Sequence, residues 1–439
     1  MKKDISFSNI KISGWRQFKN IDIDFHERLT VITGANGAGK SSILSILSQH
    51  FGWSRKFLST PKRDDGSIDY KYLFGIEGHD EEYIKKLVKT PHNNQESFKI
   101  GSLRYSSGQE TNIKINVGSI SQYDASFDGA IPLDGLFIGA NRYTQSYQKV
   151  TQIPTEPMMP DIAINQWLVS FRQKMSGAYT QDSPSMKMKQ SLISMAMFGP
   201  GNINSPPIPA LSNAYNGFVE VLKKILPESL GFKQLSIRTP DIVMITDTGE
   251  WLIDEASGGV SSLLDLSWQI YLYSIGKNKF TVIIDEPENH LHPSMQRKLM
   301  NSLLNAFPNA QFIVSTHSPF IVSSVKESYV YVLQYKNENI QTKNPIPLEH
   351  GVYKPGEERF VFSQKLNLFT KSGTASEVLR NVLGVPVTIP DWVADEIETI
   401  IDRYRKEPFS SELLEKMRNE LQQLGLDEHF PEVVSKIAN

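Results

Sequence analysis

The chain has 439 residues, 39% hydrophobic and 21% charged, which is enough for two or three domains of an ordinary globular protein. It contains no cysteine, which excludes disulfide bonds and cysteine-ligated metals and suits a reducing compartment. A formal net charge of −2 excludes nucleic-acid binding through bulk positive charge, so any DNA contact would need a local patch. The first residues lack the apolar core of a signal peptide, and no apolar run is long enough to span a bilayer. We therefore expect a soluble, cytoplasmic protein with no membrane partner.

The first predicted elements lead into a phosphate-binding loop. Three short strands are predicted at 5–12, 18–25 and 29–33, the second from its alternation of apolar and polar residues. The next eight residues, Gly34–Ser41, read GANGAGKS, which is the complete pattern G-x-x-x-x-G-K-[ST], and a helical pattern follows. A strand before the loop and a helix after it are the context in which this pattern binds nucleotide phosphates.

The chemistry of this loop gives each part a role. Its glycines let successive backbone N–H groups curl around phosphate oxygens, and the N-terminus of the following helix adds its positive dipole end. Lys40 can reach the β- and γ-phosphates, and the Ser41 hydroxyl is placed for Mg²⁺. We therefore predict ATP and Mg²⁺ as ligands. The predicted phosphate-binding residues are Asn36, Gly37, Ala38, Gly39, Lys40, Ser41 and Ser42.

The middle of the chain mixes strands and helices. Strands are predicted at 97–105, 111–117, 135–139, 234–238, 242–246 and 251–253, and helices at 164–175, 186–198 and 213–226. The Pro- and Gly-rich segment 199–209 is predicted to be an exposed loop. Residues 53–95 are polar and have no assigned element. Within them, the basic and aromatic stretch 53–63 has two interpretations, a nucleic-acid contact and a solvated loop.

From residue 256 onward, alternating helices and strands predict a parallel α/β sheet. The predicted helices are 261–273 and 293–307, and the predicted strands are 280–284, 311–315 and 329–334. The small residues 256–262 open the first of these helices. They fit either a second anion site at a helix N-terminus or a plain helix cap.

Two of these strands end in side chains that suit phosphate chemistry. The strand 280–284 is followed by Asp285, placed to hold Mg²⁺, and Glu286, placed to polarise an attacking water as a general base. The strand 311–315 leads to His317, which can hydrogen-bond the γ-phosphate. We therefore predict Lys40, Glu286 and His317 as catalytic residues, and Ser41 and Asp285 as metal ligands.

In this order, the motifs resemble the ATP-binding cassette (ABC) family, in the branch of the SMC, RecF and OLD ATPases. Residues 34–41 match its Walker A motif, and 257–259 resemble its signature motif. Residues 284–288 match its Walker B motif, 289–293 its D-loop and 315–319 its switch histidine. The segment 14–18 resembles the family's first-strand region, which would place Arg16 near the nucleotide. The resemblance covers about residues 5–335.

The resemblance implies a mechanism that one chain cannot complete, because two cassettes of this family enclose two ATP molecules between them. Ser257 and Gly259 of one subunit would contact the γ-phosphate held by the loop of the other, so a homodimer or higher oligomer is implied. Two features depart from the family pattern: Val260 stands where Gln or Glu is usual, and Gln145 is a weak candidate for the Q-loop.

The same resemblance limits what else the chain can carry. The histidines at 290 and 292 could suggest a metal, but the D-loop match explains them without one. There is no room for the long coiled-coil arms of SMC proteins. No acidic cluster of the Toprim kind and no histidine cluster of the HNH kind is present, so a nuclease would be a separate chain.

These features predict an α/β fold: an ABC-type P-loop ATPase core, with a mixed sheet and flanking helices, an inserted helical region and a C-terminal helical module. The expected segments are 1–160 for the first part of the core, 161–230 for the inserted helices, 231–345 for the second part of the core, and 346–439 for a helical module. This last segment resembles the C-terminal module of compact antiphage-defence ATPases of the Septu type. It would contact other subunits or a partner.

Three functions stay open at this point. In the first, the chain is an ATPase that assembles or gates an antiphage-defence complex with a separate HNH or Toprim nuclease, and double-stranded DNA is a candidate ligand. In the second, it is an ATP-locked scaffold with little turnover, which Val260 and the missing Q-loop would permit. In the third, it is a RecF-like DNA-repair ATPase. The presence of Glu286 and His317 favours a working ATPase.

Overall fold

The chain divides into two compact units, Met1–Val378 and Leu379–Asn439. The computed structural model describes residues 4–53, 55–63, 70–75, 96–117, 121–141, 147–152, 156–175, 182–338 and 358–367, and then 375, 378–379, 391–404, 410–426, 430 and 433–434. Among the helices of these described residues, none is long and apolar enough to cross a membrane.

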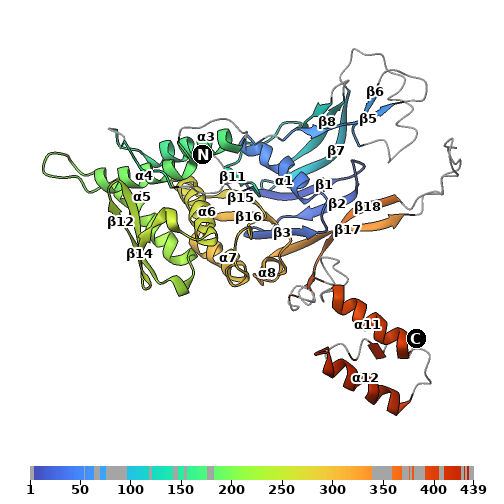
Figure 1. The fold of residues 1–439 in the computed structure, drawn as a ribbon. Coiled ribbons are helices and arrows are strands. Elements are labelled where there is room, and N and C mark those ends of the chain that lie inside the picture. Colours follow the sequence, from blue (N-terminus) through green and yellow to red (C-terminus); the bar gives the residue numbers. More distant parts are fainter. Residues whose placement is uncertain are drawn as a thin grey trace. The chain divides into compact units, whose positions relative to one another are not determined.

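The larger unit is built on a mixed sheet of eleven strands (Figure 1). In sheet order, its strands are β10 (Ala125–Phe127), β8 (Glu110–Val117), β7 (Glu96–Tyr105), β1 (Phe7–Ile12), β2 (Phe18–Asp24), β18 (Glu358–Lys365), β17 (Tyr329–Glu338), β3 (Leu29–Gly34), β16 (Ala310–Ser315), β15 (Phe280–Asp285) and β11 (Gly135–Ile138). The predicted α/β fold with a mixed sheet and flanking helices is confirmed.

The parallel half of this sheet positions the predicted phosphate chemistry. Strands β11, β15, β16, β3 and β17 run parallel to one another. Every residue of β3, β15 and β16 is buried, which is the pattern of strands covered by helices on both faces. Because parallel strands point the same way, their carboxyl ends meet at one edge of the sheet.

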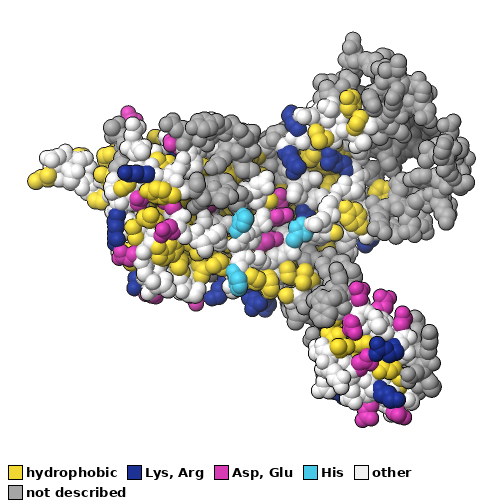
Figure 2. All heavy atoms as spheres, viewed as in Figure 1, with side chains coloured by type: hydrophobic (Ala, Val, Ile, Leu, Met, Phe, Trp, Pro, Cys, Tyr) yellow, Lys and Arg dark blue, Asp and Glu magenta, His cyan; other side chains and the backbone are white. Residues whose placement is uncertain are grey.

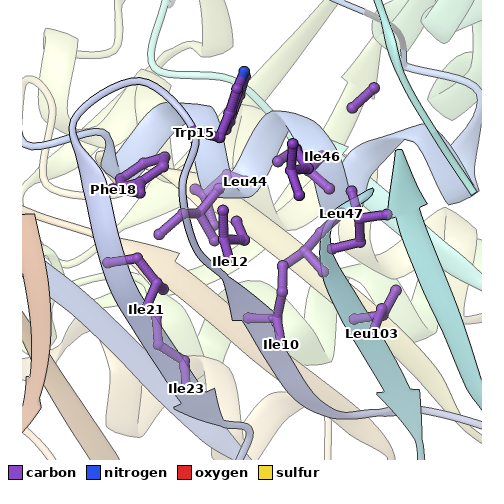
Figure 3. Close-up of a cluster of buried hydrophobic side chains, with 14 of the residues drawn as sticks. Ile10, Ile12, Trp15, Phe18, Ile21, Ile23, Leu44, Ile46, Leu47 and Leu103 are labelled. Carbon is purple, nitrogen blue, oxygen red and sulfur yellow. The ribbon is translucent and has the colours of Figure 1, made fainter. Parts of the chain in front are cut away.

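The antiparallel half of the sheet forms the core against helix α1 (Lys40–Ser48). Alternate residues of β1 and β2 point inward, and they pack against the apolar side chains of α1. Figure 3 shows these side chains meeting: Ile10, Ile12, Trp15, Phe18, Ile21, Ile23, Leu44, Ile46, Leu47 and Leu103. The helix that follows the phosphate-binding loop is therefore held against this half of the sheet by the burial of apolar side chains.

Among the described residues of the larger unit, the other α-helices are α3 (Pro160–Met175), α4 (Pro184–Phe198), α5 (Pro209–Ile225), α6 (Gly258–Ser274), α7 (Pro293–Ala306) and α8 (Pro319–Val322). Helix α3 packs on α4 and α6, and α5 packs on α4, α6 and α7. A three-stranded antiparallel sheet, β12 (Phe232–Arg238), β13 (Asp241–Thr246) and β14 (Gly249–Leu252), joins this group. The predicted helices all form, and α5 begins four residues earlier than expected because Pro209 occupies its first turn.

One boundary differs from the expectation. Residues 346–439 were predicted to form a helical module, but Glu358–Lys365 is a strand of the main sheet, antiparallel to β17 and parallel to β2. Its residues Phe360 and Val361 are buried, so this part of the expected module belongs to the ATPase core. The unassigned segment 53–95 contains short strands: β4 (Phe57–Leu58), which pairs with β9 (Gln122–Tyr123), and β5 (Thr60–Arg63), which pairs with β6 (Tyr70–Leu73).

The smaller unit contains helices α11 (Asp391–Tyr404) and α12 (Ser411–Gln423). They share a core of their own, formed by Val393, Ile397, Ile400, Ile401, Leu413, Met417, Leu421, Leu426 and Val433. Helix α12 begins at an N-cap serine, Ser410, whose side chain accepts a hydrogen bond from the backbone N–H of Leu413. The helical character predicted for the end of the chain is present in these residues.

Candidate active site

The phosphate-binding loop connects β3 to α1 in a conformation that glycine makes possible. Gly34, Gly37 and Gly39 have φ angles of +136°, +78° and +95°. A Cβ on Gly34 would lie 2.4 Å from the carbonyl oxygen of Leu333, and one on Gly39 would lie 2.3 Å from Cζ of Phe18. The loop therefore curls tightly against its surroundings, and Ala35, Asn36 and Gly37 remain exposed, so the outer face of the loop is free to receive a phosphate chain.

Lys40, the first residue of α1, is 6% exposed. Its ammonium donates to the backbone oxygens of Gly34 and Ala35, at 3.0 and 3.1 Å. Burial lowers the pKa of Lys40 to about 8, against an opposing effect of nearby carboxylates, Asp285 first. A buried cation that is held by two neutral carbonyls fits an anionic ligand such as a triphosphate, which would supply the missing negative charge.

Asp285 is the last residue of β15 and is 8% exposed. Ser315, its neighbour in the register of β16, donates its hydroxyl to Oδ1 of Asp285. The other carboxylate oxygen is the one that could serve a cation. In the described part of the chain, no group of three or more His, Asp or Glu side chains could hold a metal, so Mg²⁺ at Ser41 and Asp285 would need phosphate oxygens and water as well.

Glu286 follows in a strained backbone conformation with φ +51°, in the left-handed region that non-glycine residues rarely occupy. Its backbone N–H donates to the carbonyl oxygen of Ser315 at 3.0 Å. The side-chain amide of Asn289 donates to Oε2 of Glu286 and to the carbonyl oxygen of Ala140, both at 3.0 Å. Asn289 thus fixes the direction of the Glu286 carboxylate, and strain of this kind is typical of functional sites.

Glu288 organises the loop that carries His317. Its Oε1 accepts hydrogen bonds from the Thr316 hydroxyl at 2.6 Å and from the backbone N–H groups of His317 and Ser318 at 2.8 and 3.1 Å. Its Oε2 is buried and has no partner among the described residues, and burial raises the pKa of this carboxyl. Such an orphaned oxygen in the centre of the site would gain from a donor or cation supplied by a ligand.

His317 lies half-buried at the end of β16, close to Lys40 and to both acids. Burial lowers its pKa, and the Lys40 ammonium lowers it further, while Glu286 and Asp285 partly oppose this. The imidazole is therefore neutral at physiological pH, with one nitrogen to donate and one to accept. Figure 2 shows histidine and acidic side chains close together on one face of the larger unit.

The signature segment lies at the beginning of α6. Ser257 is the N-cap residue of this helix, but its hydroxyl makes no capping hydrogen bond, and both Ser257 and Gly258 are exposed. A Cβ on Gly259 would lie 3.2 Å from the carbonyl oxygen of His290, so this glycine packs against the D-loop. Val260, the departure from the family pattern, is buried in the core.

Arg16 lies in a cavity of about 750 Å³ beside α1. Its guanidinium packs over the rings of Trp15, Phe57 and Tyr123, with its carbon 5.1, 5.0 and 5.8 Å from the ring centroids. Ser42 of α1 lines the same cavity. A cavity at this place could hold the nucleoside end of a nucleotide whose phosphates occupy the loop.

Several predicted features lie elsewhere or have another role. Gln145 falls outside the described residues. The ring of Trp53 packs against Phe137, 5.7 Å between centroids, and under Arg172, so it is part of the internal packing. His292 caps α7 by accepting from the backbone N–H of Ser294, which explains it without a metal.

Four further residues support the site, and we assigned them no role from the sequence. Glu288 and Asn289 occur within the motifs themselves, where their spacing from Asp285 is the available signal. Ser315 is recognisable because it ends a buried strand. Gln17, which donates from Nε2 to the carbonyl oxygen of Gly37 at 2.9 Å, has no signal in the sequence, since its role depends on how the β1–β2 turn folds over the loop.

The parallel strands β3, β16 and β15 lie side by side in this order, and they bring the phosphate-binding loop, the histidine and the two acids to one edge of the sheet. The chain is therefore a P-loop ATPase with a core of the ABC type. Two AAA families match parts of it. "AAA domain" matches residues 9–139, and "AAA domain, putative AbiEii toxin, Type IV TA system" matches residues 242–323.

Within this class, the chain is similar to ATPases of antiphage-defence systems. It is 23% identical to the Retron Vc95 probable ATPase of Vibrio cholerae, over 78% of this chain and 76% of that protein. It is also 23% identical to the Septu protein PtuA of Bacillus thuringiensis, over 75% of this chain and 78% of that protein. In the PtuA protein of Bacillus mycoides, 22% identical, the match spans 40% of the protein's length.

Among solved structures, the chain is similar to SMC head domains. The head domain of Thermotoga maritima is 14% identical, with a TM-score of 0.39 over 75% of this chain and 94% of that chain. The head domain of Pyrococcus furiosus, solved with an extended coiled coil and bound to the C-terminal domain of ScpA, is 14% identical, with a TM-score of 0.45 over 86% of this chain and 99% of that chain.

Proposed function

We propose that two copies of this chain close around ATP and Mg²⁺, and that hydrolysis reopens them, in order to assemble or gate an antiphage-defence complex with a separate nuclease. The observation that carries this proposal is the exposed beginning of α6. Ser257 is placed as an N-cap and yet leaves its helix uncapped, so the first N–H groups of α6 and the Ser257 hydroxyl are available to an anion from outside the subunit.

Each residue of the proposed site has a separate role. Lys40 and the loop bind the phosphates, Ser41 and Asp285 would hold Mg²⁺, and Arg16 and Ser42 line the cavity proposed for the nucleoside. Mg²⁺, when bound, would neutralise charge on the β- and γ-phosphate oxygens. Ser257 and Gly259 of the second copy would complete the contacts to the γ-phosphate.

The proton chemistry falls to Glu286 and His317. Asn289 occupies Oε2 of Glu286, so Oε1 is the atom that would accept a proton from the attacking water. The neutral imidazole of His317 can donate a hydrogen bond to the γ-phosphate without adding a proton to the reaction. The two side chains come from neighbouring strands, and this fixes their spacing independently of the ligand.

The proposed division of the chain follows from this function. Residues 1–160 and 231–345, together with β18, would form the ATPase core, and the helices of 161–230 would support the signature segment from outside the catalytic edge. The two-helix unit after residue 378 has a hydrophobic core of its own and is proposed to contact other subunits or the nuclease, of HNH or Toprim type. Double-stranded DNA remains a candidate ligand of the assembled complex.

The test is the oligomeric state of the purified chain and of its Glu286→Gln variant, measured by light scattering with and without ATP and Mg²⁺, together with ATP turnover. Glu286→Gln should bind ATP and accumulate as a closed dimer, and Lys40→Ala should bind no ATP and stay open. A variant that holds ATP as a monomer at all concentrations would refute closure around the nucleotide. Unchanged turnover in Glu286→Gln would remove Glu286 as the base.

The same measurement separates the other functions. A stable oligomer of the unmodified chain that retains unhydrolysed ATP would favour the scaffold. Turnover that rises strongly with double-stranded DNA, in the absence of any partner, would favour a DNA-repair ATPase. Turnover that rises with a co-purified nuclease would support the defence complex.

A further inference from the structure

Lys189, on helix α4, is a buried lysine far in sequence from every motif of the ATPase. Its side chain has no exposed surface. Its ammonium lies 2.7 Å from Oδ2 of Asp254 and 3.4 Å from Oδ1 of Asp241, and it donates to the carbonyl oxygen of Gln148 at 2.6 Å. A lysine buried in this way must be paired, because an isolated charge is strongly disfavoured away from water.

The main partner of Lys189 belongs to the segment that leads into the signature motif. Asp254 lies in the short 3-10 turn Ile253–Glu255, three residues before Ser257, and its side chain is 3% exposed. The turn is closed by a hydrogen bond from the backbone N–H of Ala256 to the carbonyl oxygen of Ile253, and Ile253 is itself buried. Holding Asp254 therefore fixes the place where α6 begins.

A third contact of Lys189, beside those to Asp254 and Asp241, is to the backbone of Gln148. Gln148 is also held through its side chain, whose Oε1 accepts from the backbone N–H of Ser183 at 3.1 Å and from its hydroxyl at 2.5 Å. Ser183 is the N-cap of α4, so the same helix holds Gln148 twice.

We propose that Lys189 is a positioning residue of the ATPase, whose ammonium fixes the turn before the signature motif so that Ser257, Gly258 and Gly259 are presented to the ATP of a second subunit. This inference rests on the proposed closure of two copies around ATP. It adds a specific role for the helices of 161–230: α4 supplies the charge that sets the position of a motif in another part of the chain.

The proposal predicts that loss of the Lys189 ammonium leaves ATP binding intact and impairs completion of the neighbouring subunit's site. A general packing defect would impair both. Lys189 touches neither the phosphate-binding loop nor the residues at the ends of β15 and β16. Without its ammonium, a subunit should bind ATP in its own loop normally and yet fail to complete the site of its neighbour. The defect should therefore act in trans.

The first experiment compares Lys189→Met with Lys187→Met. Lys187 lies two residues earlier on α4 and pairs with Asp182 at 2.7 Å, and its side chain is 24% exposed, whereas that of Lys189 has no exposed surface, so Lys187 serves as the control on the same helix. In the Glu286→Gln background, Lys189→Met should leave ATP affinity within about twofold and weaken ATP-dependent dimerisation. With Glu286 intact, it should lower kcat roughly ten- to hundredfold, because misplacing a contact by about 1 Å can cost that much. The control should change none of these quantities.

Lys189→Met alone leaves a buried carboxylate unpaired, so a variant that also carries Asp254→Asn keeps the test valid if the single variant does not fold. The double variant removes the charges of Lys189 and Asp254 with nearly unchanged shapes, and the Asp241 carboxylate that remains is partly exposed to solvent, at 16%. Like the single variant, it should keep its affinity for ATP and dimerise more weakly. Equal loss of ATP affinity and dimerisation in a folded variant would overturn the proposal, as would normal kcat and dimerisation.

The second experiment mixes two variants that are each impaired in ATP turnover. In a mixed dimer, Lys189→Met contributes an intact phosphate-binding loop, and Lys40→Ala contributes an intact signature segment, so one complete site should form and turnover should exceed that of either variant alone. A mixture of Ser257→Arg with Lys40→Ala is the matched control. Ser257→Arg alters the signature segment itself, and Lys40→Ala alters the phosphate-binding loop. Recovery in this control without recovery for Lys189→Met would place its effect inside its own subunit and overturn the inference.

The design distinguishes failure of this inference from failure of the proposed function. If the parent Glu286→Gln protein binds ATP and remains a monomer, the proposal that two copies close around ATP is wrong. The role proposed for Lys189 in that closure is then wrong as well. If the parent closes and Lys189→Met closes equally well, the proposed function stands and the inference about Lys189 is wrong.

Discussion

The lowered pKa of Lys40 predicts that ATP affinity depends on pH in a range where an ordinary lysine would give no change. Only the ammonium form attracts the phosphates, and burial lowers its pKa from 10.5 to about 8 in the free protein. Bound phosphate supplies negative charge and so raises this pKa again. ATP affinity should therefore be constant below about pH 7.5 and fall as the pH rises through 8, because binding must then recover a proton that Lys40 has lost.

The pKa of Lys40 determines how much the affinity for ATP should change with pH. With a pKa of about 8, about one molecule in ten carries the ammonium at pH 9, so the Kd for ATP should be roughly tenfold higher at pH 9 than at pH 7. At pH 8.5, binding should take up roughly 0.8 of a proton. The pKa shift corresponds to roughly 3 kcal/mol by which the empty site disfavours the ammonium, and bound phosphate relieves it.

The assay is equilibrium binding of a fluorescent, non-hydrolysable ATP analogue between pH 7 and 9.5 at fixed free Mg²⁺, with calorimetry in two buffers to count protons. This range lies above the last ionisation of a phosphate, near pH 6, so the ligand does not contribute. Lys40→Arg is the control, because the guanidinium stays charged throughout. Its affinity is expected to be lower overall but independent of pH.

Two results would refute this reasoning. A flat profile in the unmodified protein would mean that Lys40 keeps an ordinary pKa in the empty site. An equal slope in Lys40→Arg would mean that another group titrates. The sign of the effect on stability gives an independent check: the buried ammonium destabilises the free protein below pH 8 and no longer does so above about 10.5, so Lys40→Met should raise the melting temperature at pH 7 and have less effect as the pH increases.

Three further predictions concern residues around this lysine. Asn289→Ala should lower kcat roughly ten- to hundredfold and leave ATP affinity unchanged, because the Glu286 carboxylate loses the donor that orients it; single-turnover kinetics would measure this. Gly39→Ala should abolish ATP binding in calorimetry, since the new Cβ would lie 2.3 Å from a ring carbon of Phe18 at φ +95°, whereas a folded variant with normal affinity would contradict the loop geometry. Glu288→Ala removes the acceptor of three hydrogen bonds and should destabilise the protein by about 1–3 kcal/mol in urea unfolding, with a fall in kcat; no change in either would show that the histidine loop is held by other contacts.

The residues at the carboxyl ends of β3, β15 and β16 could be predicted from the sequence because each motif occupies one short stretch of the chain. Each motif consists of an apolar strand and the polar residues that follow it, so the strand, its end and the side chain at that end appear within ten residues. The parallel arrangement then follows from the alternation of helices and strands. For the same reason, the α/β class and the ATPase activity could be predicted before any contact was known.

The features that the sequence did not reveal depend on distant residues. Strand β18 pairs with β17 across nineteen intervening residues, so no short turn marks the pair as a hairpin. The rings around Arg16 come from positions 15, 57 and 123, and the strands β4 and β9 that carry two of them are two residues long. Lys189 had no distinguishing pattern, because a lysine on a helix is exposed unless tertiary contacts bury it.

The strained backbone of Glu286 suggests a route by which turnover would be linked to association under the proposed closure. A φ of +51° costs about 1–3 kcal/mol, and it is held by the hydrogen bond to Ser315 and by the contacts of Asn289. Asn289 is also where the signature helix meets the D-loop, since the Ser262 hydroxyl donates to its carbonyl oxygen at 3.4 Å. A second subunit that pressed on the start of α6 would therefore act on the residue that directs the base. Under the proposed closure, the helix whose exposed end would contact the ATP of the second subunit also contacts Asn289, the residue that orients the Glu286 carboxylate, so alignment of the base and closure of the dimer would favour one another.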